Sequence, residues 1–206
     1  MKKSKFITLE GGEGAGKSTI IKKIKKYLDS QHIPCIITRE PGGTKTSEDI
    51  RNILKSRSVN PYTEIFLFEA ARAELVSSLI LPALKENIWV ICDRFYDSTI
   101  AYQSAGRKIE EDLVSSLNDI ARQGLKPDIT FLLDVDPTVG LSRITKRDQD
   151  PNDPLEQENI DFYLKVQKKY LEIAKNEPNR IKIIDSNQKP LLVWNNIKEI
   201  LKNEIN

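Results

Sequence analysis

Short runs of apolar residues alternate along the chain with longer stretches in which apolar residues recur every three or four positions. Within the short runs, apolar side chains occupy nearly consecutive positions, which is the pattern of strands buried on both faces. The runs lie at residues 6–9, 33–38, 88–92, 129–135 and 181–184. They predict a five-stranded parallel sheet.

The longer stretches have the spacing of amphipathic helices. They lie at residues 17–30, 44–55, 61–86, 110–123, 138–146, 155–175 and 190–202. Strands that alternate with helices predict an α/β fold in three layers, with helices on both faces of the sheet and right-handed crossovers. A length of 206 residues suits one domain, so we expect a single domain over residues 1–206.

The segment Asp-Gln-Asp-Pro-Asn-Asp-Pro at 148–154 contains turn formers and helix breakers between two predicted helices. We interpret it as part of a short lid, over residues 143–156, that passes over one end of the sheet. An ordinary surface loop is the alternative.

Composition narrows the class of protein. A net charge of +2, from 32 basic and 30 acidic residues, does not indicate a broad nucleic-acid-binding face. The apolar run after the basic start is too short for a signal peptide, and no run reaches the ~18 residues of a membrane span. Cys35 and Cys92 lie in apolar segments and are expected to be buried, reduced thiols. With His32 as the only histidine, a Cys/His metal site is not expected. A cytoplasmic protein without a nucleic-acid or membrane partner follows.

A glycine-rich segment at 11–18, Gly-Gly-Glu-Gly-Ala-Gly-Lys-Ser, follows the first apolar run and matches G-x-x-x-x-G-K-[ST] in full. Glycines let backbone N–H groups approach phosphate oxygens, and the N-terminus of the following helix favours anions. Lys17 supplies a charge for the β- and γ-phosphates, and the Ser18 hydroxyl suits Mg²⁺. The predicted ATP-binding residues are Gly11, Gly12, Glu13, Gly14, Ala15, Gly16, Lys17, Ser18 and Thr19.

Glu13 is unusual in a phosphate-binding loop, because its carboxylate should repel the ligand. Its side chain is tolerable there if it points away from the phosphates, for example towards a sugar hydroxyl of the acceptor molecule. The alternative is that Glu13 simply faces water.

A carboxylate at the end of a neighbouring strand usually completes such a Mg²⁺ site. Asp93 and Asp134 both follow apolar runs. We favour Asp93, because Arg94 comes directly after it and a guanidinium suits bidentate phosphate binding. Asp134 precedes an expected helix start, where Asp136 is a candidate cap before Pro137.

The chain has no Asn-Lys-x-Asp signature of small GTPases. Arginines near predicted strand ends favour transfer between two phosphate-bearing molecules, with Lys17 and Arg94 as catalytic candidates. One alternative is a kinase for a deoxynucleoside or another nucleoside monophosphate, although Arg94 favours a phosphorylated acceptor. A second alternative is a nucleotide-dependent binding switch.

Several segments resemble, in the same order, those of bacterial thymidylate kinases, and the resemblance covers nearly the whole chain. Besides the phosphate loop they are Thr-Arg-Glu-Pro-Gly-Gly-Thr at 38–44, Phe-Leu-Phe-Glu-Ala-Ala-Arg at 66–72, Asp-Arg-Phe at 93–95 and Ala-Tyr-Gln at 101–103. The resemblance implies a P-loop kinase that converts dTMP to dTDP with ATP and Mg²⁺, as a homodimer packed through helices.

The resemblance also implies roles for individual residues. Phe68 would stack on thymine, Arg72 would contact the base edge, and Arg94 would hold the acceptor phosphate. Tyr102 would pack beside the deoxyribose, and Glu13 would meet the 3′-hydroxyl. Gln103 and Thr99 would lie near the base, whereas Arg39, Glu40 and Pro41 would frame the acceptor phosphate. On pattern alone, Phe68 would be a core residue, Arg72 a solvated charge, and Tyr102 and Gln103 ordinary loop or helix-end residues.

The lid departs from the family pattern. Ala15 leaves the phosphate loop without an arginine, so a lid arginine is expected, yet Pro154 stands where family members often have one. Lys146, Arg147 and Arg143 remain as bases. We expect Arg147, together with Arg143, to act in phosphoryl transfer, with Arg143 also placed to flank adenine.

Overall fold

The computed structural model describes residues 4–144 and 158–205. Its centre is a parallel five-stranded sheet in the order β2-β3-β1-β4-β5. The strands are β1 (Phe6–Glu10), β2 (Cys35–Arg39), β3 (Trp89–Asp93), β4 (Ile129–Asp134) and β5 (Ile181–Asp185). Each predicted run forms a strand, so the predicted three-layer α/β fold is confirmed.

The register brings charged residues together at one edge of the sheet. Leu9 of β1 pairs with Asp93, which also pairs with Arg39 of β2. On the other side of β1, Asp134 pairs with Asp185. Because all strands run in the same direction, these residues mark the carboxyl edge, where ligands bind in open α/β sheets.

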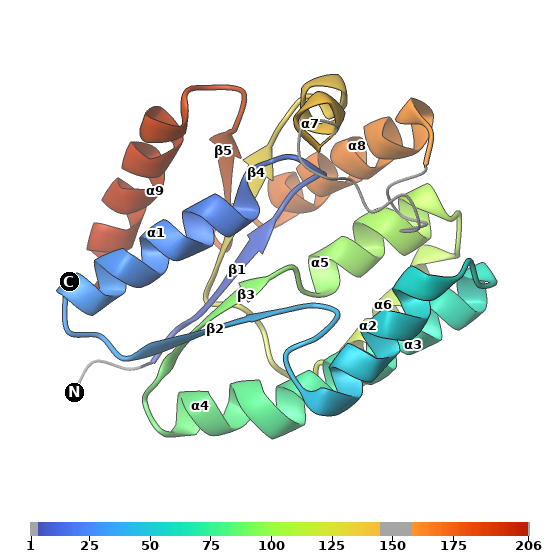
Figure 1. Cartoon of the computed structure of the whole chain (residues 1–206), viewed down its shortest axis with the longest axis horizontal. Helices are drawn as coiled ribbons and strands as arrows, with labels where there is room; N and C mark the ends of the chain where they lie inside the picture. Colours follow the sequence, from blue (N-terminus) through green and yellow to red (C-terminus); the bar gives the residue numbers. More distant parts are fainter. Residues whose placement is uncertain (1–3, 145–157, 206) are drawn as a thin grey trace.

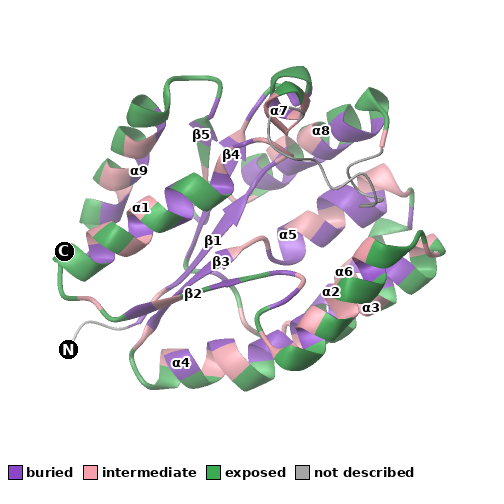
Figure 2. Cartoon of the chain, in the orientation of Figure 1, coloured by how far each residue is buried: buried purple, intermediate pink, exposed green. Residues whose placement is uncertain are grey.

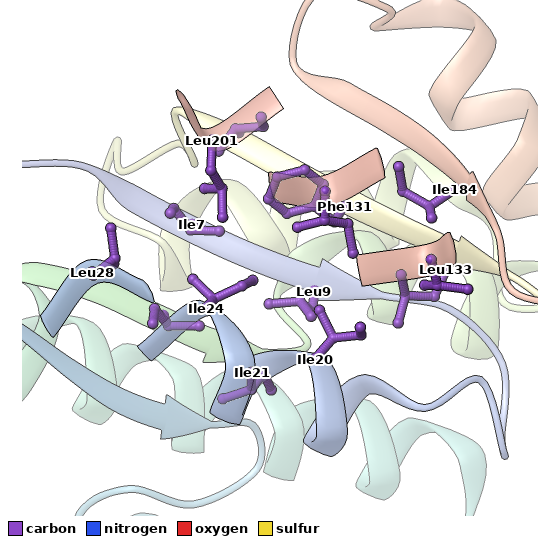
Figure 3. Packing of buried hydrophobic residues seen from close by; sticks show 14 of the residues in the cluster. Ile7, Leu9, Ile20, Ile21, Ile24, Leu28, Phe131, Leu133, Ile184 and Leu201 are labelled. Carbon is purple, nitrogen blue, oxygen red and sulfur yellow. The ribbon is translucent and has the colours of Figure 1, made fainter. Parts of the chain in front are cut away.

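Alternate side chains of each strand enter opposite layers of the core. Ile7, Leu9, Phe131 and Leu133 point towards α1 (Lys17–Ser30) and α9 (Pro190–Ile205), and Figure 3 shows them packed against Ile20, Ile24, Leu28 and Leu201. Phe6, Val90 and Cys92 point to the opposite face. Nearly every residue of the central strands β1, β3 and β4 is buried (Figure 2), so both faces of these strands are covered. This burial explains why the strands read as continuous apolar runs.

The remaining helices build the rest of the fold (Figure 1). They are α2 (Lys45–Ser56), α3 (Pro61–Leu75), α4 (Leu81–Lys85), α5 (Tyr96–Thr99), α6 (Glu111–Ala121), α7 (Pro137–Ile144) and α8 (Ile160–Asn176), with π-helical segments η1 (Val76–Ile80) and η2 (Ile100–Gly106). Helix α8 starts at Ile160 and is capped by the Asn159 side chain. Residues 158 and 159, which the predicted helix over 155–175 included, are therefore not helical.

Two further differences from the predicted helices have local causes. The helix predicted over 61–86 is divided by η1, which ends just before Pro82, a residue without the amide hydrogen that a regular α-helix needs. Helix α5 and segment η2 were not predicted from the apolar pattern. The predicted cap at Asp136 is confirmed, because its Oδ1 accepts from Thr138 N at 2.8 Å.

Cys35 and Cys92 are buried and form no disulfide. None of the helices in residues 4–144 and 158–205 is long and apolar enough to cross a membrane.

Candidate active site

The phosphate loop connects β1 to α1 at the centre of the carboxyl edge. Gly11, Gly14 and Gly16 have φ angles of 133°, 67° and 91°, which favour glycine. A Cβ at Gly14 would lie 2.1 Å from the Gly140 carbonyl oxygen, whereas a Cβ at Gly16 would meet nothing within 4 Å. Gly14 is thus required for packing against α7, and the backbone at Gly16 borders open space where a phosphate can approach.

Lys17 begins α1, and its ammonium donates to the carbonyl oxygens of Gly11 and Gly12, at 3.1 and 3.0 Å. These bonds hold the charge inside the loop. Burial and the nearby Arg94 lower the pKa of Lys17, although Glu13 and Asp93 oppose this shift. Ser18 and Thr19 are exposed on the first turn of α1, so their hydroxyls are accessible to a ligand.

The Glu13 side chain is directed towards the end of β3. Arg94 Nη2 forms an ion pair with Glu13 Oε1, and the Tyr102 hydroxyl donates to the same oxygen at 3.0 Å. Burial would raise the pKa of Glu13, but Arg94, Lys17 and the Tyr102 hydrogen bond together lower it. The alternative that Glu13 simply faces water is therefore wrong.

A second carboxylate, Glu10, lies beneath the same arginine and is 1% exposed. It accepts hydrogen bonds from Phe95 N at 2.7 Å, from Ser98 Oγ at 2.6 Å and from the Tyr170 hydroxyl at 2.9 Å. Burial, reinforced by Asp97, raises the pKa of Glu10 to about 7. The phosphate-loop motif gave no indication that Glu10 binds the segment that follows Arg94.

Asp93 is a suitable Mg²⁺ ligand. Its Oδ1 is buried and has no hydrogen-bond partner, which leaves it able to bind a cation or the water around one. The competing candidate, Asp134, accepts a hydrogen bond from Gln167 Nε2 at 2.8 Å. No group of three or more His, Cys, Asp or Glu residues forms a metal site among the described residues, so a cation here would also need oxygens from a nucleotide.

A cleft of about 930 Å³ opens along the carboxyl edge of the sheet. Residues from the phosphate loop form one part of its lining, and Arg39, Glu40, Asp93 and Arg94 form another. The cleft therefore brings together residues predicted for the donor phosphates and residues predicted for the acceptor phosphate.

Arg39 and the following turn form one wall of this cleft. Arg39 Nη2 donates to both Glu48 carboxylate oxygens, at 2.8 and 2.7 Å. The Glu40–Pro41 peptide bond is cis. Burial raises the pKa of Glu40 to about 7, although its partner Arg72 opposes that shift.

Arg72 is 1% exposed, and all five of its N–H donors have partners. Its partners are Glu40 (Nε at 2.9 Å and Nη2 at 2.6 Å), Glu69 at 2.7 Å, Asn118 at 2.6 Å and Thr99 at 2.9 Å. The interpretation of Arg72 as a solvated charge is therefore wrong. The contact between Arg72 and a base edge stays a prediction.

Phe68 is only partly buried and belongs to none of the core clusters of the described residues, so the interpretation of Phe68 as a core residue is wrong. Tyr102 and Gln103 are 5% and 2% exposed, and both belong to η2 rather than to a loop. Gln103 Nε2 donates to Glu64 Oε1 at 2.8 Å.

Comparison with known proteins agrees with this geometry. A model of the thymidylate kinase family matches residues 9–197. A thymidylate kinase from Clostridium novyi is 43% identical over 205 residues, covering 98% of this chain and 100% of that protein. One from Carboxydothermus hydrogenoformans is 43% identical over 202 residues, covering 97% and 98%. The crystal structure of thymidylate kinase from Ehrlichia chaffeensis superposes with a TM-score of 0.79 at 34% identity, covering 97% of this chain and 99% of that one.

The chain belongs to the thymidylate kinase family. Members of this family phosphorylate dTMP to dTDP, and the expected enzyme class, a nucleotide-binding kinase with a P-loop fold, is confirmed.

Besides Glu10, sequence reasoning missed a second residue of this thymidylate kinase site. Arg51 of α2 lines the cleft and donates from Nη1 to the Pro41 carbonyl oxygen at 3.1 Å. It lies one helical turn after the buried Ser47, and this spacing was the only sequence signal that it faces the Glu40–Pro41 turn.

At the donor end of the cleft, Arg143 donates to the carbonyl oxygens of Gly14 and Ser186, both at 3.2 Å. It therefore lies beside the phosphate loop. Lys146, Arg147, the segment at 148–154 and Pro154 lie outside the described residues.

Proposed function

We propose that the chain transfers the γ-phosphoryl group of ATP to dTMP within the cleft at the carboxyl edge, using Mg²⁺. The observation that carries this proposal is that one cleft of about 930 Å³ is lined both by the phosphate loop and by Arg39, Arg51 and Arg94. A binding switch has no need for an arginine cluster opposite its nucleotide phosphates, whereas a kinase must hold a second phosphate there.

The proposed chemistry depends on positioning and on electrostatic stabilisation. Lys17 and the loop amides hold the β- and γ-phosphates of ATP. Arg94 holds the dTMP phosphate, and Arg51 and Arg39 extend the positive wall around it. Arg143 and Arg147 supply further charge from the donor side. For Arg147, this role is proposed from the sequence alone.

Ser18 and Asp93 are the residues proposed to hold Mg²⁺, because an accessible hydroxyl and an unpartnered carboxylate oxygen border the same cleft. When bound, the ion would neutralise negative charge on the phosphates of ATP.

The acceptor nucleoside is proposed to lie between α3 and η2. The partly exposed ring of Phe68 would stack on thymine, with about 1–3 kcal/mol from such a contact. Tyr102 would pack beside the deoxyribose, and Glu13 would accept from the 3′-hydroxyl. Thr99, Gln103 and Arg72 would surround the base.

We also propose a cytoplasmic homodimer. Apolar side chains are exposed on α2, α3 and α6, which lie side by side in Figure 1, and burying them against a second copy would be favourable. They are Ile53, Tyr62, Phe66, Leu113 and Ile120, exposed by 36 to 75%. The Phe66→Glu variant should then sediment as a monomer at concentrations where the native chain sediments as a dimer, and equal sedimentation would reject this surface as the interface.

The deciding experiment is ADP release from Mg·ATP with single nucleoside monophosphates or deoxynucleosides added. We expect the fastest turnover with dTMP and slower turnover with dUMP. Faster turnover with another acceptor would show that this acceptor, and not dTMP, is the preferred substrate. Slow hydrolysis that no acceptor accelerates would favour the binding switch.

A further inference from the structure

Two side-chain hydrogen bonds join α3 to the segment that contains α5 and η2. Glu64 Oε1 accepts from Gln103 Nε2 at 2.8 Å, and Thr99 Oγ1 accepts from Arg72 Nη2 at 2.9 Å. Phe68 lies midway between Glu64 and Arg72 in α3, at a spacing of four residues from each, so all three share one face of the helix. The proposed base site is therefore bounded by Phe68 and by these two hydrogen bonds.

The contact with Glu64 determines how the Gln103 amide is oriented. The Glu64 oxygen is the acceptor in this contact, so the NH₂ group of Gln103 faces it. The amide oxygen of Gln103 is consequently turned away from Glu64. Both residues are buried, at 7% and 2% exposure, so water does not readily replace this contact.

Arg107 also binds Glu64. Its Nε donates to Oε1, the oxygen that accepts from Gln103, and its Nη2 donates to Oε2, each at 3.1 Å, while its Nη1 pairs with Glu158. These contacts hold the Glu64 carboxylate in place against Gln103. Because Glu64 uses the NH₂ group of Gln103, the amide oxygen is the Gln103 atom that this contact leaves available to a ligand.

We propose that Glu64 is a specificity-determining residue that selects a thymine-type base by fixing the orientation of the Gln103 amide. The inference rests on the proposed binding of dTMP beside Phe68. Thymine and uracil carry an N3–H donor that matches an amide oxygen. Cytosine has an unprotonated N3, an acceptor, which would face that oxygen without a hydrogen between them. Glu64 acts through Gln103 and is a positioning residue.

The test compares dTMP with 5-methyl-dCMP, which has the same methyl group but the cytosine edge. In Glu64→Met, no acceptor remains at this position, so the NH₂ group of Gln103 loses its partner and the amide can turn over. We expect the ratio of kcat/KM for dTMP to that for 5-methyl-dCMP to fall at least about tenfold, because a base edge matched by hydrogen bonds is strongly discriminated from its mismatch. Glu158→Met, an equivalent change that leaves the contact between Glu64 and Gln103 in place, should keep the native ratio.

Gln103→Met provides a second variant, with similar size and no amide, in case Glu64→Met does not fold. Its ratio should also fall at least about tenfold. An equal loss of kcat/KM on both acceptors in Glu64→Met would give Glu64 a merely structural role and overturn the proposal. A native ratio in Gln103→Met would overturn it as well. If the native chain phosphorylates neither acceptor, the proposed function fails first, and this outcome is distinct from the other two.

Discussion

Arg94 and Glu13 form an ion pair that joins the end of β3 to the phosphate loop. Arg94 Nη1 also donates to the Gly11 carbonyl oxygen at 3.2 Å, within the same loop. The arginine proposed to hold the acceptor phosphate is therefore attached to the loop proposed to hold the donor phosphates. This attachment limits how far the two reacting groups can separate, which is the main requirement of phosphoryl transfer by positioning.

Replacing Arg94 by lysine should remove bidentate phosphate binding while keeping the charge. We expect kcat/KM for dTMP to fall by about a hundredfold or more, with a smaller change in the KM for ATP, because Lys17 and the loop amides remain. Steady-state kinetics with each substrate varied would measure this. Arg122→Lys, whose partner is the exposed Asp119, is the matched control and should be neutral. A loss of less than threefold in Arg94→Lys would contradict the assignment.

Asp93→Asn should raise the Mg²⁺ concentration needed for half-maximal rate by about tenfold or more, since a charged ligand near the ion is lost. Titration of activity with Mg²⁺ at saturating ATP and dTMP measures this directly. Asp134→Asn changes a carboxylate that already binds Gln167 and should leave the Mg²⁺ titration unchanged. If Asp134→Asn alone raised the Mg²⁺ requirement, Asp134 of β4 would be the metal ligand in place of Asp93.

Gly16→Ala separates backbone strain from phosphate binding. The φ angles of Gly16 and Gly124 are 91° and 78°, and a Cβ at either position meets nothing within 4 Å. Each alanine variant should lose about 1–2 kcal/mol of unfolding free energy from the left-handed conformation. Only Gly16→Ala should also raise the KM for ATP, because its methyl group would enter the phosphate site. Equal KM values for the two variants would show that the Gly16 backbone is not part of that site.

Arg72→Ala should lower the unfolding free energy by about 3–5 kcal/mol, because it leaves the buried Glu40 and Glu69 without their cation. Denaturant unfolding at pH 7 measures the loss. Arg122→Ala serves as the control and should cost less than about 1 kcal/mol, because its ion pair lies at the surface. A loss of that small size in Arg72→Ala would mean that Arg72 does not stabilise the wall of the cleft.

The pKa of Glu10, raised to about 7, predicts a pH effect on stability. Because the folded-state pKa lies above the unfolded value of 4.5, Glu10 contributes to the free energy of unfolding. This contribution is full below pH 4.5 and is lost as the pH rises through 7. Glu10→Gln lacks this titration, so its unfolding free energy should improve relative to the native chain between pH 5 and 8, by up to about 3 kcal/mol. Glu172→Gln, at an exposed site, should show a constant difference from the native chain. A constant difference for Glu10→Gln as well would reject the raised pKa.

The strands were predictable because each reads as a nearly continuous apolar run, and the central strands β1, β3 and β4 are buried on both faces. The helical region from Tyr96 to Gly106 was not, because polar side chains such as Asp97 and Gln103 are buried in it through partners elsewhere in the chain. Asp97, for example, binds Arg180 at 2.7 Å. No periodicity within the segment could reveal such a partner.

The place of the phosphate loop between β1 and α1 was predictable, since its glycine spacing follows directly from the geometry of phosphate binding. Arg72 was harder to interpret, because its partners come from residues 40, 69, 99 and 118. Local sequence could indicate only a helix charge, and resemblance only a base contact. Tertiary contacts determine which of its donors are already used.

The strand order also has a kinetic consequence. β2 and β3, which lead into Arg39 and Arg94, lie on one side of β1, whereas β4 and β5, which lead into Arg143 and Ser186, lie on the other. The two nucleotides would therefore reach the central strand from opposite sides, and neither would pass through the position of the other. Substrate addition should accordingly follow a random order, in which ATP or dTMP binds first and either product leaves first.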